Sequence, residues 1–268
     1  MDNQSFLKQE FINKINEIAI NAGQKIMAIY EKDFDVYEKK DKSPLTEADL
    51  ASHQYIMNEL AELDAGYPIL SEESAEISWQ ERQTWSTYWL IDPLDGTKEF
   101  IKKNGEFTVN IALIHENEPV LGVVYAPVID TLYYATTEIG AWMQQAGYLA
   151  QIKVADRPET PVRIVGSRSH QSDAMAGYLK QFPDYKVVPM GSSLKLCVVA
   201  EGKADLYPRL GPTCEWDTAA AHAVVNAAGG RCVIFDENTN SETKDLTYNT
   251  KESLLNPYFI VKGPVINE

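Results

Sequence analysis

Cysteine is scarce in this chain of 268 residues, and positive charge and long apolar runs are scarce as well. Cys197, Cys214 and Cys232 are odd in number, widely spaced and form no C-x-x-C pair. Such a set provides neither a disulfide framework nor the ligand spacing of a zinc site. Free cysteines are typical of a reducing compartment, so we expect a cytoplasmic protein.

No uninterrupted apolar segment occurs near the amino terminus, because acidic residues are interspersed through residues 1–20. This argues against a signal peptide and against a membrane span at this position. The apolar spacing instead predicts an amphipathic helix that reaches about Tyr30, with Phe6, Phe11 and Ile15 roughly on one face. We expect no transmembrane segment, and a peripheral association with the inner membrane is left open.

Positive charge is outnumbered, with 24 lysines and arginines against 39 aspartates and glutamates and a formal net charge of -15. The negative charge is spread along the chain, so a nucleic-acid partner is not expected. A small anionic molecule can still bind where metal ions and a few cationic side chains reverse the potential locally. The composition is therefore compatible with a phosphorylated small-molecule ligand.

Acidic residues gather in three clusters that lie far apart in the sequence: residues 72–73, residues 92–97 and residues 215–217. Hard divalent cations prefer carboxylate and carbonyl oxygens as ligands. Mg²⁺ is usually held by a few carboxylates, and substrate phosphate completes its coordination shell. Together the clusters indicate a Mg²⁺ site for phosphate chemistry.

The segment 92–97, with sequence DPLDGT, follows a predicted strand that ends at Asp92. Pro93 disfavours the helical conformation for the residue before it, so Asp92 should remain extended. A tight turn would then bring Asp92, Asp95 and the carbonyl of Leu94 to one side. Gly96 permits a close backbone approach, and the amide groups that follow it are free to bind phosphate.

Each acidic cluster also has an ordinary structural interpretation. Asp-Pro and Asp-Gly pairs are common in turns, Glu72 could be a surface acid, and Asp217 could cap the helix that follows it. All three clusters, however, end predicted strands or begin predicted helices, which is where α/β folds commonly bind ligands. Their joint occurrence favours the metal site.

The order of predicted elements divides the chain into two parts. Residues 1–155 form an α+β lobe that carries most of the candidate metal ligands and contains a β-meander over residues 107–136, with a hairpin turn at 116–119. Residues 156–268 alternate strand and helix and form an α/β lobe that contains Asp217. The fold class is therefore α/β (α+β).

The motifs SEES at 71–74, DPLDGT at 92–97 and WDTAA at 216–220 resemble those of the lithium-sensitive, Mg²⁺-dependent inositol monophosphatase superfamily. With GSRSH at 166–170 and GSSLKLCVVAEGKADLYPR at 191–209, the chain is most similar to the 3'(2'),5'-bisphosphate nucleotidases of the CysQ type. The resemblance covers nearly the whole chain. It implies a layered α-β-α-β-α sandwich.

The resemblance also implies roles for the acidic residues. Glu72, Asp92 and the carbonyl of Leu94 would hold one Mg²⁺. Asp92, Asp95 and Asp217 would hold a second, and a third, weaker ion is left open. A metal site of this kind belongs to an enzyme that hydrolyses a phosphate ester.

Thr97 and Asp49 are implied as catalytic residues together with Glu72. In the family pattern the acid of the segment 46–49 accepts a hydrogen bond from the DGT threonine, so Thr97 and Glu72 would orient the attacking water. Thr46 and Asp49 also have the spacing of a plain capping box before an apolar helix. A cap and a hydrogen bond to Thr97 are physically compatible.

Substrate recognition is implied for two segments that each follow a strand and precede a helix. Ser167, His170, Gly191 and Lys195 would contact the adenosine and its non-reacting 5'-phosphate. Capped helix starts and a solvent-exposed lysine are the ordinary alternatives. Tyr207 and Arg209 would contact base or phosphate, or form a buried tyrosine and a structural ion pair. The reacting phosphate would lie against Glu72, Leu94, Asp95, Gly96, Thr97 and Asp217.

The function implied is hydrolysis of the 3'-phosphate of adenosine 3',5'-bisphosphate to AMP and phosphate, in sulfur assimilation. Use of 3'-phosphoadenylyl sulfate, lithium sensitivity and the choice between monomer and homodimer are left open. An inositol or sugar monophosphatase with the same metals is the nearest alternative. A nucleotide-responsive binding protein without catalysis is an alternative of another class.

Overall fold

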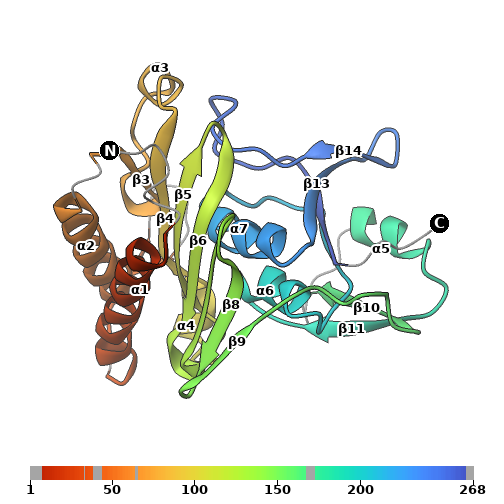
Figure 1. Cartoon of the computed structure of the whole chain (residues 1–268), viewed down its shortest axis with the longest axis horizontal. Coiled ribbons are helices and arrows are strands. Elements are labelled where there is room, and N and C mark those ends of the chain that lie inside the picture. The colour runs from red at the N-terminus through yellow and green to blue at the C-terminus, as the bar shows by residue number, and fades with distance from the viewer. Residues whose placement is uncertain (1–7, 33, 39–43, 64–65, 167–172, 264–268) are drawn as a thin grey trace.

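The computed structural model describes residues 8–32, 34–38, 44–63, 66–166 and 173–263. Within these ranges the chain forms alternating layers of helix and sheet (Figure 1). An outer pair of helices is followed by a seven-stranded sheet, a second pair of helices, a six-stranded sheet and a last short helix. The predicted α-β-α-β-α sandwich is confirmed.

The outer layer consists of α1 (Gln9–Tyr30) and α2 (Glu47–Glu62). The α1 helix buries one apolar face that includes Ile12, Ile15 and Ile18, as its spacing predicted. Phe11 stacks on Trp89 of the neighbouring sheet with ring centroids 6.1 Å apart. Phe6, which the prediction placed on the same face, lies outside the described residues. A short pair, β1 (Val36–Glu38) and β2 (Pro44–Thr46), connects the two helices.

The first sheet follows chain order and is a meander from its second strand onward. Its strands are β3 (Ile69–Ser71), β4 (Thr87–Asp95), β5 (Thr108–His115), β6 (Glu118–Ala126), β7 (Thr131–Thr136), β8 (Gly140–Gln145) and β9 (Tyr148–Gln151). The pair β3 and β4 is parallel and the later pairs are antiparallel. The predicted meander is thus confirmed, and it extends further than residue 136.

The hairpin between β5 and β6 is tighter than predicted. Glu116 and Asn117 both have positive φ, at 49° and 68°, and His115 pairs with Glu118. Two successive residues with positive φ form the mirror-image turn that matches the right-handed twist of the flanking strands. The turn therefore needs only two residues, and β6 begins before Pro119.

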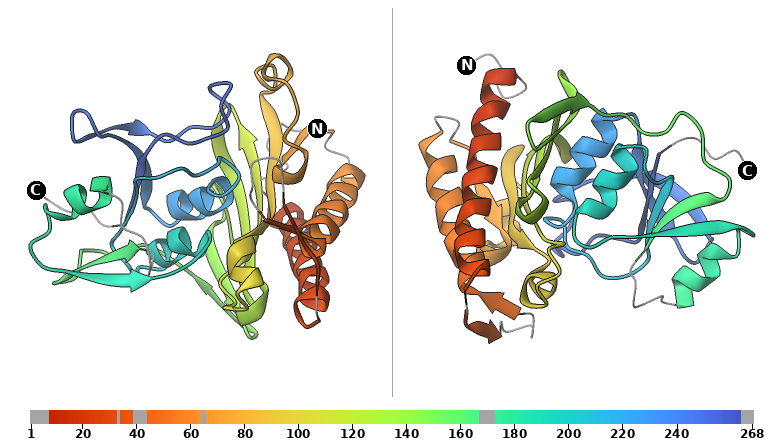
Figure 2. Two further views of the ribbon diagram at one scale, coloured as in Figure 1. Left: turned by 180° about the vertical axis from the view of Figure 1, so that it is seen from behind. Right: turned by 90° about the horizontal axis from the view of Figure 1, so that it is seen from below.

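The second half of the chain builds the remaining layers. Its sheet has the order β11 (Tyr185–Pro189), β10 (Val162–Gly166), β12 (Leu206–Arg209), β15 (Phe259–Lys262), β13 (Arg231–Asp236) and β14 (Ser241–Asp245). The helices α6 (Leu194–Ala200) and α7 (Ala219–Ala227) lie between the two sheets, and α5 (Asp173–Leu179) covers the far face (Figures 1 and 2). Short elements complete the chain: η2 (Glu72–Ser74), α3 (Trp79–Arg82), α4 (Thr97–Ile101) and η3 (Pro127–Ile129).

The helix α7 packs very closely on β6. A Cβ added to Gly122 of β6 would lie 2.0 Å from the carbonyl oxygen of Ala220 and 2.8 Å from the Cβ of Ala223. Only glycine allows the helix to approach so closely. This contact positions the start of α7 against the first sheet, and the same hydrophobic core contains Val124 of β6 and Val224 of α7. This core contains residues from both predicted lobes, so it does not separate them, and the division near residue 155 stays a prediction.

Two glycines end helices as predicted. Gly202 follows α6 and Gly229 follows α7, with φ of 70° and 87°. Glycine enters this left-handed conformation without steric strain, and each position is soon followed by a strand. None of the helices in the described ranges has the length and apolar character needed to span a lipid bilayer.

Candidate active site

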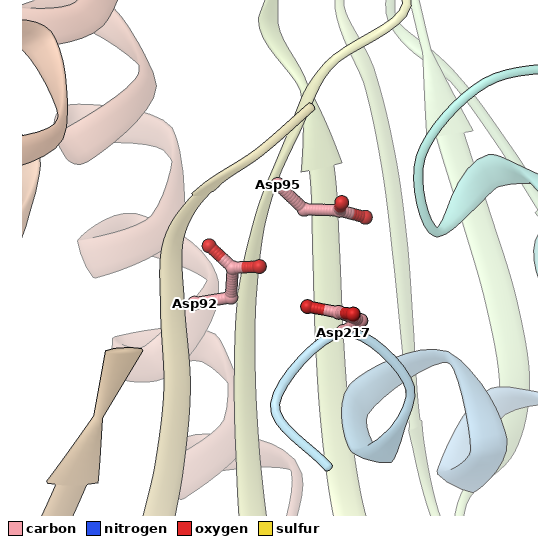
Figure 3. A group of neighbouring side chains, drawn as sticks. All are labelled: Asp92, Asp95 and Asp217. Atoms are coloured by element: carbon pink, nitrogen blue, oxygen red, sulfur yellow. The ribbon is translucent and has the colours of Figure 1, made fainter. Parts of the chain in front are cut away.

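The strand β4 carries two of the predicted ligands, Asp92 and Asp95 (Figure 3). The prediction that the strand ends at Asp92 and turns tightly is wrong, since β4 continues to Asp95. The ladder with β5 is interrupted between these two residues, which pair with Asn110 and Thr108. Pro93 has no N–H to donate, and prolines inside sheets are confined to edges and bulges. The bulge still turns both carboxylates into the same space, as predicted.

Gly96 lets the chain leave β4 at this point. Its φ is 96°, and an added Cβ would lie 3.0 Å from the carbonyl oxygen of Glu106. Both observations agree with the predicted close backbone approach at this glycine. The helix α4 begins at the next residue, Thr97, so the first amide groups of α4 lie beside the acidic residues.

Asp217 reaches the same space from the loop before α7 (Figure 3). The alternative role as a helix cap does not hold, since Thr218 occupies the capping position of α7. The Asp217 carboxylate instead accepts a hydrogen bond of 2.9 Å from the backbone N–H of Cys214. One carboxylate oxygen from each of Asp92, Asp95 and Asp217 lies within 4.8 Å of the others.

The raised pKa values of this cluster indicate that a cation would stabilise its ionised carboxylates. Burial raises the pKa of Asp92 well above its ordinary value, and the charges of Glu72, Asp95 and Asp217 and a hydrogen bond with Glu72 add to the shift. Burial and the charges of Asp95 and Glu72 raise the pKa of Asp217 to about 8. Buried carboxylates that repel one another are stabilised by a divalent cation, and an all-oxygen donor set suits Mg²⁺. The residues present therefore fit the predicted metal.

Glu72 and Leu94 are the other two predicted metal ligands. Glu72 begins η2 directly after β3, and its interaction with Asp92 brings the first acidic cluster to the other two. The N–H of Leu94 donates to Asp92 Oδ1 over 3.1 Å, and its carbonyl oxygen lies 3.4 Å from Thr97 Oγ1. Three clusters distant in the sequence therefore meet at one place.

Thr97 and Asp49 are joined as predicted. The Thr97 hydroxyl donates to Asp49 Oδ1 over 3.1 Å. The other carboxylate oxygen of Asp49 accepts from the backbone N–H of Thr46 at 2.7 Å and from its hydroxyl at 2.6 Å. Both interpretations of this segment are correct at once, because one buried carboxylate completes the capping box of α2 and also orients Thr97.

A small cavity of about 60 Å³ adjoins the acidic cluster. It is lined by Asp95, Ser192, Lys195, Leu196, Tyr207, Arg209, Thr213, Asp217 and Thr218. The alternative of a solvent-exposed Lys195 is wrong: burial lowers the pKa of this lysine, and the charge of Asp95 opposes the shift. The cavity therefore has two cationic side chains, Lys195 and Arg209, beside two carboxylates.

None of the other three predicted substrate contacts is among the described residues that line this cavity. Ser167 and His170 lie outside the described residues. Gly191 lies against Glu106, since an added Cβ would be 2.8 Å from the Cβ of that residue. Gly191 does not itself line the cavity, but it precedes Ser192, which does.

Sequence reasoning missed Ser193. Its backbone N–H donates to Asp95 Oδ2 over 2.5 Å, and its hydroxyl oxygen lies 2.7 Å from the same atom and 2.6 Å from the carbonyl oxygen of Asp217. Asn110 donates to this hydroxyl over 2.8 Å. Ser193 thus links two acidic segments. The pair of serines before α6 was a signal that something polar binds there, but it did not identify Asp95 as the partner.

Ser192 was also missed. Its φ is 42°, a strained value for a residue other than glycine, and its buried hydroxyl has no hydrogen-bond partner among the described residues. Strained backbone of this kind concentrates at functional sites. The unpaired hydroxyl lines the cavity and is free to bond a ligand.

Comparisons with known proteins agree with this site. The model of the Inositol monophosphatase family matches residues 7–262. The chain is 49% identical over 252 residues to the 3'(2'),5'-bisphosphate nucleotidase CysQ of Salmonella typhimurium, covering 93% of this chain and 98% of the relative. The protein of the same name in Escherichia coli K12 is 50% identical with the same coverage.

Solved structures show the same fold. The crystal structure of CysQ from Bacteroides thetaiotaomicron matches with a TM-score of 0.83 and 41% identity, over 98% of this chain and all of that one. An inositol monophosphatase from Anabaena, at 23% identity, matches with a TM-score of 0.70 over 96% and 91% of the two chains and supports the fold alone. From its motifs, its layered fold and these matches, the chain belongs to the inositol monophosphatase family.

Proposed function

We propose that this protein is a Mg²⁺-dependent 3'(2'),5'-bisphosphate nucleotidase that hydrolyses the 3'-phosphate of adenosine 3',5'-bisphosphate to AMP and phosphate. The observation that carries the proposal is the convergence of Asp92, Asp95 and Asp217 beside a cavity lined by Lys195 and Arg209. Relatives about half identical over nearly their whole length are named as such nucleotidases. Hydrolysis of 3'-phosphoadenylyl sulfate and a place in sulfur assimilation belong to the same proposal.

Members of this family use divalent metal ions. We assign Glu72, Asp92 and the Leu94 carbonyl to one Mg²⁺, and Asp92, Asp95 and Asp217 to a second. Bound Mg²⁺ supplies a water of lowered pKa and neutralises charge on the attacking and leaving oxygens. These ligands account for two ions.

Thr97 and Glu72 position the attacking water in this proposal. The Thr97 hydroxyl uses its proton in the bond to Asp49, so its lone pairs remain available to accept a hydrogen bond from the attacking water. Asp49 is held by two further hydrogen bonds from Thr46, which restricts the direction of the Thr97 hydroxyl. A hydroxyl held in this way can orient the reacting water at little entropic cost.

The cavity beside Asp95 and Asp217 provides the anion-binding part of the site. Lys195 and Arg209 offer charge-assisted hydrogen bonds to phosphate oxygens, and Ser192 offers an unpaired hydroxyl. Ser167, His170 and Gly191 remain proposed contacts of the nucleoside and its 5'-phosphate. Gly96 and the start of α4 would face the reacting phosphate.

The test is phosphate release by the purified protein with adenosine 3',5'-bisphosphate, 3'-phosphoadenylyl sulfate, inositol 1-phosphate and fructose 1,6-bisphosphate, each with Mg²⁺ or EDTA and with or without lithium. We expect Mg²⁺-dependent turnover that strongly prefers the two nucleotides. Preference for inositol or sugar phosphate would keep the metal site and refute the nucleotide assignment. Nucleotide binding with no turnover of any substrate would instead support a binding protein.

A cytoplasmic location, the division near residue 155 and the choice between monomer and homodimer stay predictions. Light scattering of the purified protein distinguishes the two oligomeric states. Fractionation of cells that express the protein tests the location, including any peripheral association with the inner membrane.

A further inference from the structure

The loop that carries Asp217, residues 213–218, is held by a later segment, residues 248–256, which we call the clasp. The two run side by side through backbone hydrogen bonds. Glu215 N–H donates to the carbonyl of Leu254, and Asn256 N–H donates to the carbonyl of Thr213, both over 2.8 Å. The side chain of Glu215 also bonds the clasp, since both oxygens of its carboxylate accept from the N–H of Asn249 at 3.1 and 2.9 Å.

Asn256 ties the two sides of Asp217 together. Its side-chain amide donates to the carbonyl oxygen of Cys214 and to the hydroxyl oxygen of Thr218, each over 3.0 Å. Cys214 in turn donates its N–H to the Asp217 carboxylate. A single asparagine therefore bonds residues on both sides of Asp217, one of which also bonds the Asp217 carboxylate.

Tyr248 supports the same loop from beneath. Its hydroxyl lies 3.2 Å from Thr218 Oγ1 and 3.0 Å from His222 Nδ1, and all three side chains are buried. Thr218 also donates to the carbonyl of Glu215 over 3.1 Å. Hydrogen bonds of Tyr248 thus connect the start of α7 to the clasp. Of these three side chains only Thr218 lines the cavity.

The metal-ligand carboxylate needs this support because its surroundings repel it. One carboxylate oxygen of Asp217 lies within 4.8 Å of oxygens of Asp92 and Asp95, a distance at which ionised carboxylates repel one another. We propose that Tyr248 and Asn256 are positioning residues that hold the Asp217 loop against this repulsion, so that the carboxylate is in place before a cation binds. The inference rests on the metal ligands proposed above.

The test uses Tyr248→Phe and Asn256→Ala. Tyr133→Phe is the matched control, since its buried hydroxyl donates to Glu201 over 2.6 Å within the same hydrophobic core, and Tyr133 belongs neither to the cavity lining nor to the acidic cluster. Two quantities are compared with wild type: the Kd for Mn²⁺ and the Mg²⁺ concentration that gives half-maximal activity. The Kd is measured by calorimetry and by the electron paramagnetic resonance signal of free Mn²⁺. Thermal midpoints in EDTA record the general loss of stability.

We expect both clasp variants to weaken Mn²⁺ binding and to raise the half-maximal Mg²⁺ concentration about threefold to tenfold, the ratio expected for one or two lost hydrogen bonds. At saturating Mg²⁺ their kcat should stay within about twofold of wild type, because the missing contacts make no bond to substrate. Tyr133→Phe should lower the thermal midpoint without changing either metal constant.

Unchanged metal constants in folded Tyr248→Phe would overturn the inference, as would an equal change in Tyr133→Phe. Tyr248→Phe removes a single hydroxyl and decides the matter alone if Asn256→Ala does not fold. The Mn²⁺ measurement separates this inference from the proposed function, since it gives the same answer if the wild type hydrolyses no nucleotide. A wild type that binds no Mn²⁺ would refute the metal ligands themselves.

Discussion

Asp95 has two opposite effects on the stability of the folded protein. Its carboxylate accepts two hydrogen bonds from Ser193, and it also adds negative charge to a buried cluster that already contains Asp92 and Asp217. The hydrogen bonds contribute to the structure, whereas the charge is useful only when a cation is present. Single substitutions can therefore separate the fold from the chemistry.

Asp95→Asn should lower kcat/KM by about 10²-fold to 10³-fold or more, because a ligand that holds charge at the reacting centre is lost. The amide oxygen can still accept from Ser193, and one repulsive charge disappears, so the thermal midpoint in EDTA should not fall. Steady-state kinetics and thermal unfolding measure the two effects. Asp236→Asn, at the end of β13 and outside the acidic cluster, is the control that should leave kcat/KM unchanged. Robust turnover by Asp95→Asn would refute the assignment.

Thr97 can be tested by its hydroxyl alone. Thr97→Val keeps the side-chain shape but removes the donor to Asp49, and we expect kcat to fall about 10²-fold to 10⁴-fold with little change in KM. Thr97→Ser keeps the hydroxyl and should recover most of the rate. If the valine and serine variants lose equal activity, the hydroxyl does not orient the water.

The contact between β6 and α7 transmits the position of the first sheet to the Asp217 loop. Gly122 allows the contact, and Ala220 and Ala223 are the small residues on the facing side of the helix. Because Asp217 lies two residues before α7, a shift of the helix would move a proposed metal ligand. Packing far from the cavity is in this way coupled to the geometry of the site.

Gly122→Ala should destabilise the protein by about 1 to 3 kcal/mol or more, since the added methyl group would overlap the carbonyl of Ala220. It should also weaken metal binding, because α7 has to move. Gly177→Ala is the matched control: this glycine of α5 has no atom within 4 Å of its added Cβ, and alanine is the better helix former. Denaturant unfolding measures both variants, and equal stability of Gly122→Ala and wild type would contradict the packing argument.

The charges of the molecule make its free energy of unfolding depend on metal and pH. The formal net charge is -15, and Asp92 of the acidic cluster and Glu215 of the neighbouring loop are buried. Burial raises the pKa of Glu215 to about 7, and burial with neighbouring charges raises that of Asp217 to about 8. Burial lowers the pKa of His222 to about 4. The folded protein is therefore a weaker acid than the unfolded chain at neutral pH.

In EDTA the free energy of unfolding should fall as the pH rises from 6.5 to 8. In this window the unfolded chain has already released the protons of Glu215 and Asp217, whereas the folded protein still binds part of them, so deprotonation favours unfolding. His222 opposes this trend only below its ordinary value of 6.5, where it releases its proton in the folded state first. Glu215 alone would contribute on the order of 3 kcal/mol over its full range.

Saturating Mg²⁺ should remove the part of the decline that comes from Asp217, because the ion binds the ionised carboxylates of the folded protein and not the unfolded chain. The part that comes from Glu215, which is not a proposed ligand, should remain. Denaturant unfolding at several pH values, with EDTA or Mg²⁺, measures the effect. Asp217→Asn in EDTA should show a shallower decline between pH 7 and 8 than wild type. A stability that is independent of pH from 6.5 to 8 in EDTA would contradict the raised pKa values.

Much of the local structure and the choice of metal ligands could be predicted from the residues. The capping box of Thr46 and Asp49, the helix-ending Gly202 and Gly229, and the two-residue turn of the β5–β6 hairpin depend on interactions between near neighbours. The resemblance of the motifs then identified Asp92, Asp95 and Asp217. The tight turn after Asp92 was predicted wrongly because it depended on pairing with β5, which no short segment reveals.

Ser193 and Tyr248 could not be predicted in the same way. The hydrogen bonds from Ser193 to Asp95 join residues 98 positions apart, and the bond between Tyr248 and Thr218 joins two loops that meet only after the sheets have packed. The sequence by itself determined the elements, their caps and the kind of oxygen donors available, because these follow from short-range sterics and hydrogen bonding. Only the tertiary structure decided which donors meet, because burial of the apolar core forces mutually repelling carboxylates into one place that they would otherwise avoid.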